Sequence, residues 1–254
     1  MNLLKNRVAI VTGASRGIGK AVAEKFAANG ANLVLCSRNK NYEFINRLKD
    51  SGTQAIYVEG DLANCEVAEK IVKMTADNFG RIDILANIAG ISPKDEKGMK
   101  IPFYEIPNDV WDRVFAVNLN SMFYLTKAVS KIMIKNKYGR IINMSSIVGL
   151  TNSEHGPACA AYSTSKSAVI GYTKAIAYEL AEFGITVNAI AGGRIDTEMS
   201  KENNEYYNEL HKKLIPMHKF GNVNDIANAF LYYAMEESGY VTGDVMNITG
   251  GWYI

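Results

Sequence analysis

Short runs of apolar residues, many of them β-branched, alternate with long amphipathic stretches from one end of the chain to the other. Strands that are apolar throughout are typical of a parallel sheet that helices cover on both faces. The pattern therefore predicts an α/β fold, a doubly wound parallel sheet of seven strands with helices on both faces. The expected strands are RVAIVT (7–12), ANLVLC (31–36), QAIYV (54–58), IDILAN (82–87), RIINMS (140–145), ITVNAI (185–190) and VMNIT (245–249).

Nothing in the sequence divides the chain into separate units. It has five prolines and no Ser/Gly-rich linker or low-complexity tract, so we treat 1–254 as a single domain. Two polar excursions interrupt the alternation: 91–107, ahead of a helix expected to begin near Asn108 or Asp109, and 198–221, which is charged and aromatic. Long excursions of this kind form either the walls of a binding site or variable surface loops.

The composition is that of a folded protein with little net charge. Of the 254 residues, 48% are hydrophobic, and 28 Lys and Arg residues face 26 Asp and Glu residues, which leaves a formal charge of +2. These values exclude general disorder, and without a dense basic cluster we expect no nucleic-acid partner. No apolar run is long enough to cross a bilayer, and the opening residues lead into a strand rather than through a signal peptide.

The cysteines point to neither a disulfide framework nor a zinc site. Cys36, Cys65 and Cys159 are odd in number, far apart and without metal-ligand spacing. We therefore expect a soluble, cytoplasmic protein with no metal and no membrane partner.

A glycine-rich turn follows the first expected strand and leads into a helical pattern that stops at Gly30. Its glycines let the backbone approach a pyrophosphate, and the helix directs unpaired N–H groups and its positive dipole end at that anion. Glycines between a strand and a helix therefore predict a dinucleotide site rather than a simple turn. The expected contacts are Gly13, Ser15, Arg16, Gly17, Ile18 and Gly19.

The end of the second strand bears on the choice of dinucleotide. NAD-selective folds of this kind place an acidic side chain there, which binds the ribose 2′-hydroxyl and repels a phosphate. Here Ser37 takes that position and Arg38 follows it, with Arg16 as a second cation nearby. A guanidinium is a planar, permanently charged partner for phosphate, so we expect NADP(H) to be preferred over NAD(H). The alternative is that Arg38 is only a solvated residue.

Tyr162 and Lys166 are four residues apart, so on a helix they share one face. A phenol with a pKa of about 10 needs a shift of roughly three units, or about 4 kcal/mol, to exchange its proton near neutrality. An ammonium about 5 Å away, at an effective dielectric constant near 20, supplies on the order of 3 kcal/mol. A cationic nicotinamide ring would add much of the remainder, so acid–base chemistry at this tyrosine requires no metal.

Together these features resemble the short-chain dehydrogenase/reductase family over nearly the whole chain. The resemblance implies a Rossmann-type fold and an enzyme that interconverts a ketone and a secondary alcohol by hydride transfer with NAD(P). The matching motifs are TGASRGIG (12–19), Asp61, NIAG (87–90), Asn118, INMSS (142–146), YSTSK (162–166), ITVNAIAGGRIDTEM (185–199) and GYVTGDVMNITGG (239–251).

The same resemblance implies four catalytic residues. Ser146, the second serine after the fifth strand, would donate a hydrogen bond to the substrate oxygen. Tyr162 would give or take the proton, Lys166 would lower the tyrosine pKa and hold the nicotinamide ribose, and Asn118 would anchor a water of the proton relay. For Asn118 alone, a bond to the local backbone is the alternative.

Further cofactor contacts are implied at the carboxyl ends of the strands, where open α/β sheets bind ligands. Asp61 and Leu62 would lie by the adenine. Asn87, Ala89 and Gly90 would line the cleft, and Ile195 and Thr197 would hold the carboxamide.

The chain departs from the family pattern at several positions. Ile88 replaces a polar residue, which we interpret as a packing substitution, and Gly192-Gly193 replaces a Pro-Gly pair, which predicts a more mobile cofactor loop. The 147–161 segment is longer than expected, and His155 and Cys159 within it either face the substrate or only shape the loop.

Arg194 stands at the predicted mouth of the site and has two interpretations. It binds an anionic or phosphorylated substrate, or it forms a structural ion pair with Asp196 or a neighbouring acid.

The overall similarity favours the 3-oxoacyl-[acyl-carrier-protein] reductase branch, whose acidic carrier protein binds basic residues near the site. Lys137 keeps one such charge, whereas Phe183 stands at the second basic position and weakens this expectation. Sugar, polyol or hydroxysteroid (bile-acid) dehydrogenases share the scaffold, and a non-catalytic NADP-sensing protein is the alternative of another class. The resemblance also implies a homotetramer, paired through helices over 108–136 and 160–183 and the last strand.

Overall fold

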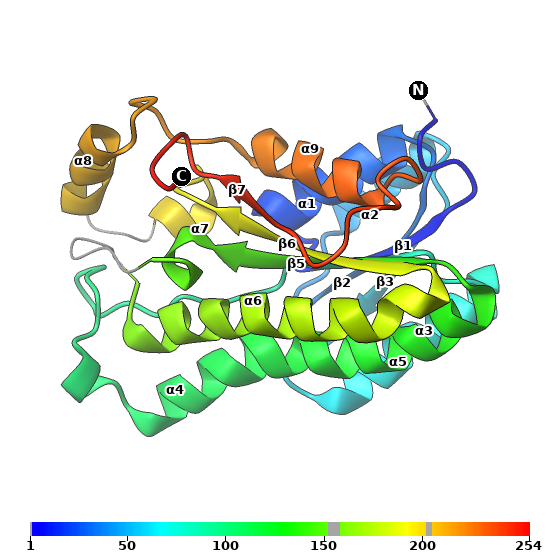
Figure 1. Ribbon diagram of the computed structural model, residues 1–254, viewed down its shortest axis with the longest axis horizontal. Coiled ribbons are helices and arrows are strands. Elements are labelled where there is room, and N and C mark those ends of the chain that lie inside the picture. The colour runs from blue at the N-terminus through cyan, green and yellow to red at the C-terminus, as the bar shows by residue number, and fades with distance from the viewer. Residues whose placement is uncertain (1, 152–157, 202–204) are drawn as a thin grey trace.

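The computed structural model describes residues 2–151, 158–201 and 205–254, and a seven-stranded sheet forms its centre (Figure 1). Every neighbouring pair of strands is parallel, in the order β3-β2-β1-β4-β5-β6-β7. The doubly wound, seven-stranded parallel sheet predicted from the sequence is confirmed. The strands are β1 (Val8–Thr12), β2 (Asn32–Ser37), β3 (Ala55–Glu59), β4 (Ile84–Asn87), β5 (Gly139–Ser146), β6 (Ile185–Gly192) and β7 (Val245–Ile248).

Helices cover both faces of the sheet, which explains why its central strands are apolar throughout. One face packs against α1 (Gly17–Ala28), α2 (Tyr42–Asp50) and α9 (Val223–Ala234), and the other against α3 (Cys65–Phe79), α5 (Ser121–Asn136) and α6 (Ala160–Leu180). In Figure 1, α1 and α9 lie above the sheet and α5 and α6 below it. The longest strands, β5 and β6, are buried along all eight of their residues.

The two polar excursions differ in structure. The first, 91–107, holds only a short 3-10 turn, η1 (Phe103–Glu105), and then enters α4 (Asn108–Phe115) at the expected residue. The second, 198–221, holds α7 (Glu198–Lys201) and α8 (Glu205–Leu214). The remaining short elements are η2 (Ala116–Asn120), a π turn between α4 and α5, and the 3-10 turns η3 (Ile147–Gly149) and η4 (Ala181–Phe183).

The strand order reverses direction between β1 and β4, and this reversal opens a crevice at their carboxyl ends. Thr12, the last residue of β1, holds the turn after β4 in place: its hydroxyl oxygen accepts hydrogen bonds from the backbone N–H groups of Ile88 (2.8 Å) and Ala89 (3.1 Å). Within the described part of the chain, no helix is long and apolar enough to span a membrane.

Candidate active site

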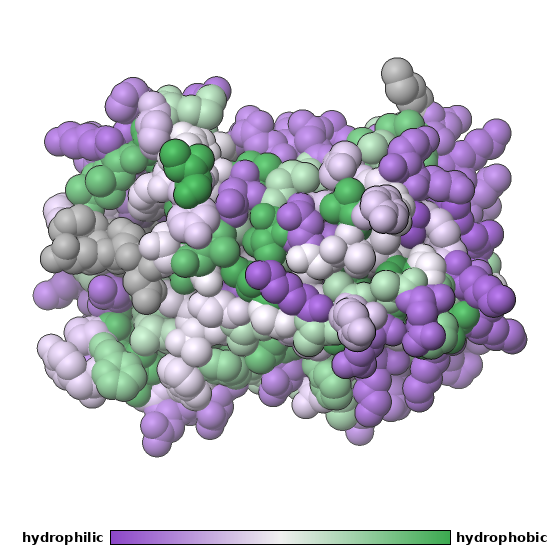
Figure 2. Space-filling view, viewed as in Figure 1, coloured by the Kyte–Doolittle hydropathy of each residue, from purple (hydrophilic) through white to green (hydrophobic). Residues whose placement is uncertain are grey.

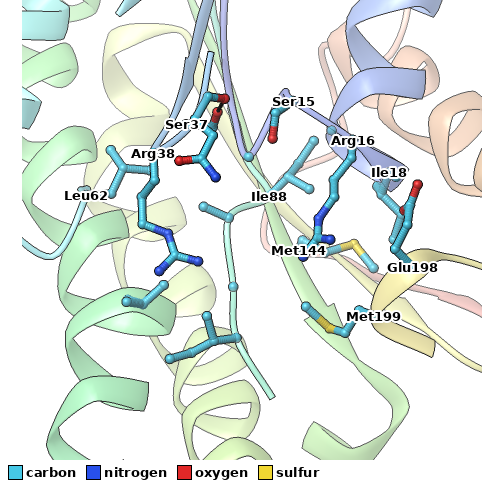
Figure 3. A pocket seen from close by; sticks show the side chains of 18 of the residues that line it. Ser15, Arg16, Ile18, Ser37, Arg38, Leu62, Ile88, Met144, Glu198 and Met199 are labelled. Atoms are coloured by element: carbon cyan, nitrogen blue, oxygen red, sulfur yellow. Dashed lines mark hydrogen bonds between the residues drawn. The ribbon is translucent and has the colours of Figure 1, made fainter. Parts of the chain in front are cut away.

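A cleft of about 760 Å³ lies along the carboxyl ends of β1, β2 and β4, and Figure 3 shows side chains that line it. Most of the predicted cofactor residues line this one cleft, although they come from distant parts of the sequence. They are Gly13, Ser15, Arg16, Gly17, Ile18, Gly19, Ser37, Arg38, Asp61, Leu62, Ala89, Gly90, Tyr162, Lys166 and Thr197.

The glycine turn fits the phosphates of a dinucleotide. No side chain caps the N-terminus of α1 and its first turn has no acidic residue, so its backbone N–H groups remain available to an anion. Gly17 has a positive φ of 55°. A Cβ on Gly19 would lie 2.2 Å from the carbonyl oxygen of Gly13, so only glycine permits this tight approach of helix and turn.

At the end of β2, the structure places Ser37 and Arg38 differently. The Ser37 hydroxyl is turned into the protein, where it donates to the Asn39 carbonyl (2.7 Å) and hydrogen-bonds the Tyr57 hydroxyl. Arg38 extends into the cleft past Leu62 (Figure 3) and forms no ion pair among the described residues. Arg16 lines the same cleft, and in Figure 3 it points into the cleft on the other side of Ile88 from Arg38.

An ion pair that the sequence did not reveal borders the end of the cleft where the adenine is predicted to lie. Arg113, on α4, donates to the Asp61 carboxylate at 2.6 Å, and both residues line the cleft. Although burial alone would raise it, the hydrogen bond from Arg113 holds the pKa of Asp61 below its ordinary value. Lys40, from the loop after β2, also lines this end and was likewise not predicted.

Two predicted cofactor contacts lie elsewhere. Asn87 is buried, and its amide donates to Asn143 Oδ1 (2.9 Å) and Thr126 Oγ1 (3.3 Å), so it ties β4 to β5 and α5 instead of lining the cleft. A buried amide needs such partners, and the sheet supplies them. Ile195 lines a second, adjoining pocket.

The predicted catalytic side chains converge where the cleft meets that second pocket. Tyr162 lines both cavities, Lys166 the first and Ser146 the second. The Lys166 Nζ lies 5.6 Å from the centre of the Tyr162 ring and donates to the Met144 carbonyl at 2.7 Å. Ser145 and Ser146 both line the second pocket, but the Ser145 hydroxyl donates to the Lys166 carbonyl at 2.8 Å, whereas Ser146 hydrogen-bonds the Tyr162 side chain.

Burial shifts the pKa values of Tyr162 and Lys166 in opposite directions. Loss of solvation raises the pKa of Tyr162 to about 12, although a hydrogen bond with Ser146 acts to lower it. Burial lowers the pKa of Lys166 to about 8. In each case burial disfavours the charged form. The surroundings of Tyr162 in the protein therefore raise its pKa, whereas the spacing to Lys166 predicts that it is lowered.

Asn118 lies in η2, the π turn between α4 and α5, an irregularity often found at functional sites. Its Oδ1 accepts from the backbone N–H of Ile91 (2.8 Å), and its Nδ2 donates to the Ile91 carbonyl (3.0 Å) and to Ser165 Oγ (3.0 Å). A Cβ on Gly90 would lie 3.3 Å from this Oδ1 and 3.6 Å from Lys166 Nζ. The amide therefore bonds backbone 27 residues away in the sequence, not the local backbone of its own helix, and Gly90 brings it close to the predicted catalytic lysine.

The second pocket, of about 160 Å³, is the candidate substrate site. It brings together segments that no sequence motif linked, including Lys94 from the first excursion, His211 from α8 and Trp252 near the C-terminus. Arg194 lines it as predicted, whereas Cys159 is fully buried beside Val114 and Ala161. His155 lies outside the described residues. Within the described chain, no three His, Cys, Asp or Glu side chains are grouped so as to hold a metal ion.

Comparisons with known proteins match the chain over its whole length. A family model described as Enoyl-(Acyl carrier protein) reductase matches residues 13–253. The 3-oxoacyl-[acyl-carrier-protein] reductase of Synechocystis sp. is 38% identical over 260 residues, which cover 99% of this chain and 98% of that protein. Two crystal structures of 3-oxoacyl-[acyl-carrier protein] reductase from Brucella melitensis, one with bound NAD, align over 100% of this chain and 93% of theirs. Their TM-scores are 0.92 and 0.91, at 34% and 33% identity.

Proposed function

Because the chain belongs to the short-chain dehydrogenase/reductase family, as its motifs predict, we propose that it interconverts 3-oxoacyl and 3-hydroxyacyl thioesters with NADP(H). It is an oxidoreductase that acts on CH–OH groups with NAD(P). The observation that carries the finer proposal is the convergence of Ser146, Tyr162 and Lys166 at the junction of a dinucleotide-sized cleft and a small second pocket.

The proposed chemistry divides the reaction between cofactor and protein. When bound, the nicotinamide cofactor supplies or accepts the hydride. During reduction, Tyr162 donates its phenolic proton to the carbonyl oxygen, and Ser146 donates a hydrogen bond to the same oxygen as negative charge develops there. Lys166, held by the Met144 carbonyl, places a positive charge near the phenolate that remains. During oxidation the same groups act in reverse, and Tyr162 accepts the alcohol proton.

We assign NADP(H) as the preferred cofactor on the chemistry of the β2 end. The side chain at the expected acid position is a serine whose hydroxyl is bonded within the protein. Arg38 and Lys40 both line the cleft beside it, and cations there favour a 2′-phosphate. A related structure contains NAD, so the choice rests on these side chains rather than on the family.

Replacing Arg38 tests this assignment. Arg38→Ala is expected to reduce kcat/KM for NADPH by about 10- to 100-fold, because it removes hydrogen bonds from a charged donor, while kcat/KM for NADH changes by less than about threefold. Arg47→Ala, on the exposed part of α2, is the matched control. A native enzyme that prefers NADH, or an equal loss with both cofactors, contradicts the assignment.

Oxoacyl thioesters are the proposed substrates because the chain matches 3-oxoacyl reductases end to end. Carrier-protein docking has weaker support. Lys137 offers one positive charge after α5, whereas Phe183, in η4 directly after α6, packs against the apolar core and offers none. Rates with a 3-oxoacyl carrier protein should therefore be compared with rates for the same acyl group on N-acetylcysteamine. A KM at least about tenfold lower for the carrier protein supports docking, and equal values argue against it.

We also propose that the protein is a homotetramer. Apolar and weakly polar side chains gather over α6 and β7, whereas hydrophilic side chains dominate the right-hand end of the same view (Figure 2). Phe123 on α5 and Tyr178 on α6 are 45% and 90% exposed in the single chain, so these helices have aromatic surface to bury against other copies.

A further inference from the structure

The second pocket contains a guanidinium that the proposed proton transfer does not use. Arg194 follows β6 and lines this pocket. One of its terminal nitrogens, Nη2, donates to the Ser200 carbonyl (2.8 Å) and to the side-chain oxygen of Asn208 on α8. The guanidinium also stacks 5.3 Å from the centre of the Phe220 ring.

This positive charge has no carboxylate partner in the described part of the chain. Ion pairs within 4.0 Å occur at several other arginines, but none includes Arg194, so a structural ion pair with Asp196 is not formed. Burial lowers the pKa of the Arg194 guanidinium, and Asp196 and Glu205 offset this only from a greater distance. A half-buried cation is costly to maintain unless it is paired, and no described carboxylate pairs with Arg194, so a role in binding an anion would explain it.

Of the two terminal guanidinium nitrogens, Nη2 is held by hydrogen bonds, whereas Nη1 has none to the described residues. Nε is sealed from solvent without a hydrogen-bond partner, and Nη1 donates to no residue that the structure describes. The charged residues that line the pocket, among those described, are Lys94 and Arg194, with His211 beside them and no aspartate or glutamate. Among the described residues, the wall therefore contributes the Arg194 guanidinium and no carboxylate toward a ligand.

We propose that Arg194 binds a carboxylate of the substrate, so that the native ligand of this pocket is an oxo acid or its hydroxy counterpart. The inference rests on the proposed function and narrows its substrate class. The carboxylate is either that of a free oxo acid or one at the far end of an oxoacyl thioester.

Ser146 and Arg194 line the same small pocket. Ser146 pairs in register with Gly192, and its hydroxyl lies 3.5 Å from the Gly192 carbonyl. Arg194 is two residues further along the chain, and consecutive Cα atoms are about 3.8 Å apart. Both residues line a pocket of about 160 Å³, so the part of a substrate between a carbonyl at Ser146 and a carboxylate at Arg194 has to fit within that volume.

The competing explanation is structural: Arg194 only holds the segment that contains α7 and α8 in place beside the pocket. Its bonds to Ser200 and Asn208 would serve that purpose without any ligand. The two explanations differ for Asn208→Ala, which removes the fastening partner and leaves the charge in place.

The experiment measures kcat/KM for two pairs of ketones, each with one anionic and one neutral member. The first pair is acetoacetate and ethyl acetoacetate, and the second is the N-acetylcysteamine thioesters of 3-oxoadipate (monothioester) and 3-oxohexanoate. Native enzyme is compared with Arg194→Gln, Arg194→Lys, Asn208→Ala and the surface control Arg47→Gln, after thermal melting has established that each variant folds.

Native enzyme is expected to prefer the anionic member of at least one pair, and that pair identifies whether the carboxylate is free or distal. Arg194→Gln should lower the anionic-to-neutral ratio by about 10- to 100-fold, Arg194→Lys should restore part of it, and Asn208→Ala should leave the ratio within about threefold. An unchanged ratio in Arg194→Gln, or an equal fall in Asn208→Ala, overturns the inference while the proposed function stands. No turnover of any of the four ketones overturns both.

Discussion

Two buried titratable side chains, Tyr162 and Lys166, determine the chemistry at the scale of single residues. Burial favours a neutral phenol and a neutral amine, with pKa values of about 12 and about 8. Reduction requires the phenol to be protonated, and its raised pKa keeps it so across the neutral range. The lysine, by contrast, must be protonated to stabilise the phenolate that forms. The lysine is therefore the group whose titration limits the reduction.

The lowered pKa of Lys166 predicts how the rate of ketone reduction depends on pH. Lys166 carries its proton below a pKa of about 8 and loses it above that pH. We expect kcat/KM for ketone reduction to be level between about pH 6 and 7 and to fall as the pH rises through about 8, because kcat/KM reports groups of the free enzyme. A profile that stays level to pH 9.5, or one that rises with pH, would contradict this assignment of the lysine.

At the residue scale, the sequence predicts the Tyr162–Lys166 pair but not the contacts of Ser145 and Asn87. The spacing of Tyr162 and Lys166 predicts a shared helix face, which is a local property of α6. The choice of Ser146 over Ser145 came from motif position alone, and its physical basis, the bond from Ser145 to the Lys166 carbonyl, depends on tertiary packing. Asn87 was expected in the cleft because its motif lies at a strand end, but a buried amide is satisfied by Asn143 across the sheet.

At the scale of elements, the start of α1 and the short helix α7 meet at the predicted pyrophosphate position. An Oε of Glu198, the first residue of α7, lies 3.4 Å from where a Cβ on Gly17 would stand, and Figure 3 shows Glu198 beside Ile18. A carboxylate near a helix N-terminus interacts favourably with the helix dipole. It therefore competes with a phosphate for the same positive end.

Removing that negative charge should strengthen cofactor binding. Glu198→Gln is expected to lower the Kd for NADPH by about two- to fivefold at low ionic strength, in line with one charge at a helix terminus. The Kd is measured by NADPH fluorescence titration, with Glu66→Gln at the exposed start of α3 as the matched control. A Kd that is unchanged or higher in Glu198→Gln would show that the carboxylate does not compete with the cofactor.

The elements themselves were largely predictable because their signals are local. Seven apolar runs became seven strands, and the helix expected near Asn108 begins there as α4. The π turn at Asn118 and the ion pair between Arg113 and Asp61 were not predictable, since no local pattern separates a π turn from regular helix. Both the π turn and the ion pair depend on how α4 packs against the cleft.

At the scale of the whole molecule, aromatic side chains are exposed on α5 and α6, the helices that we propose to pair between subunits. Tetramer formation is expected to give a solution mass near four times the 28.0 kDa of one chain, as measured by light scattering after gel filtration. Tyr178→Glu should reduce that mass, because it places a charge on the exposed face of α6. Tyr42→Glu, at an exposed position on α2, serves as the control. A native mass of 28.0 kDa would refute the proposal.

The overall topology was readable from the sequence, whereas the substrate pocket was not. Continuous apolar strands between amphipathic stretches specify a covered parallel sheet, and the sheet order then places the cleft at the β1–β4 reversal. The second pocket joins Lys94, Arg194 and Trp252, which are far apart in the sequence. Such a pocket depends on how the two excursions fold over the sheet, which periodicity does not encode.

The most direct test of catalysis through Tyr162 is the rate of NADPH oxidation with 3-oxohexanoyl and 3-oxoadipyl N-acetylcysteamine thioesters, by native enzyme and by Tyr162→Phe. The account predicts turnover by the native enzyme and a fall in kcat of about 10³-fold in Tyr162→Phe, with the Kd for NADPH within about threefold and Tyr178→Phe unaffected. Native enzyme that binds NADPH tightly but reduces neither thioester, or a Tyr162→Phe variant that keeps most of its activity, would contradict it.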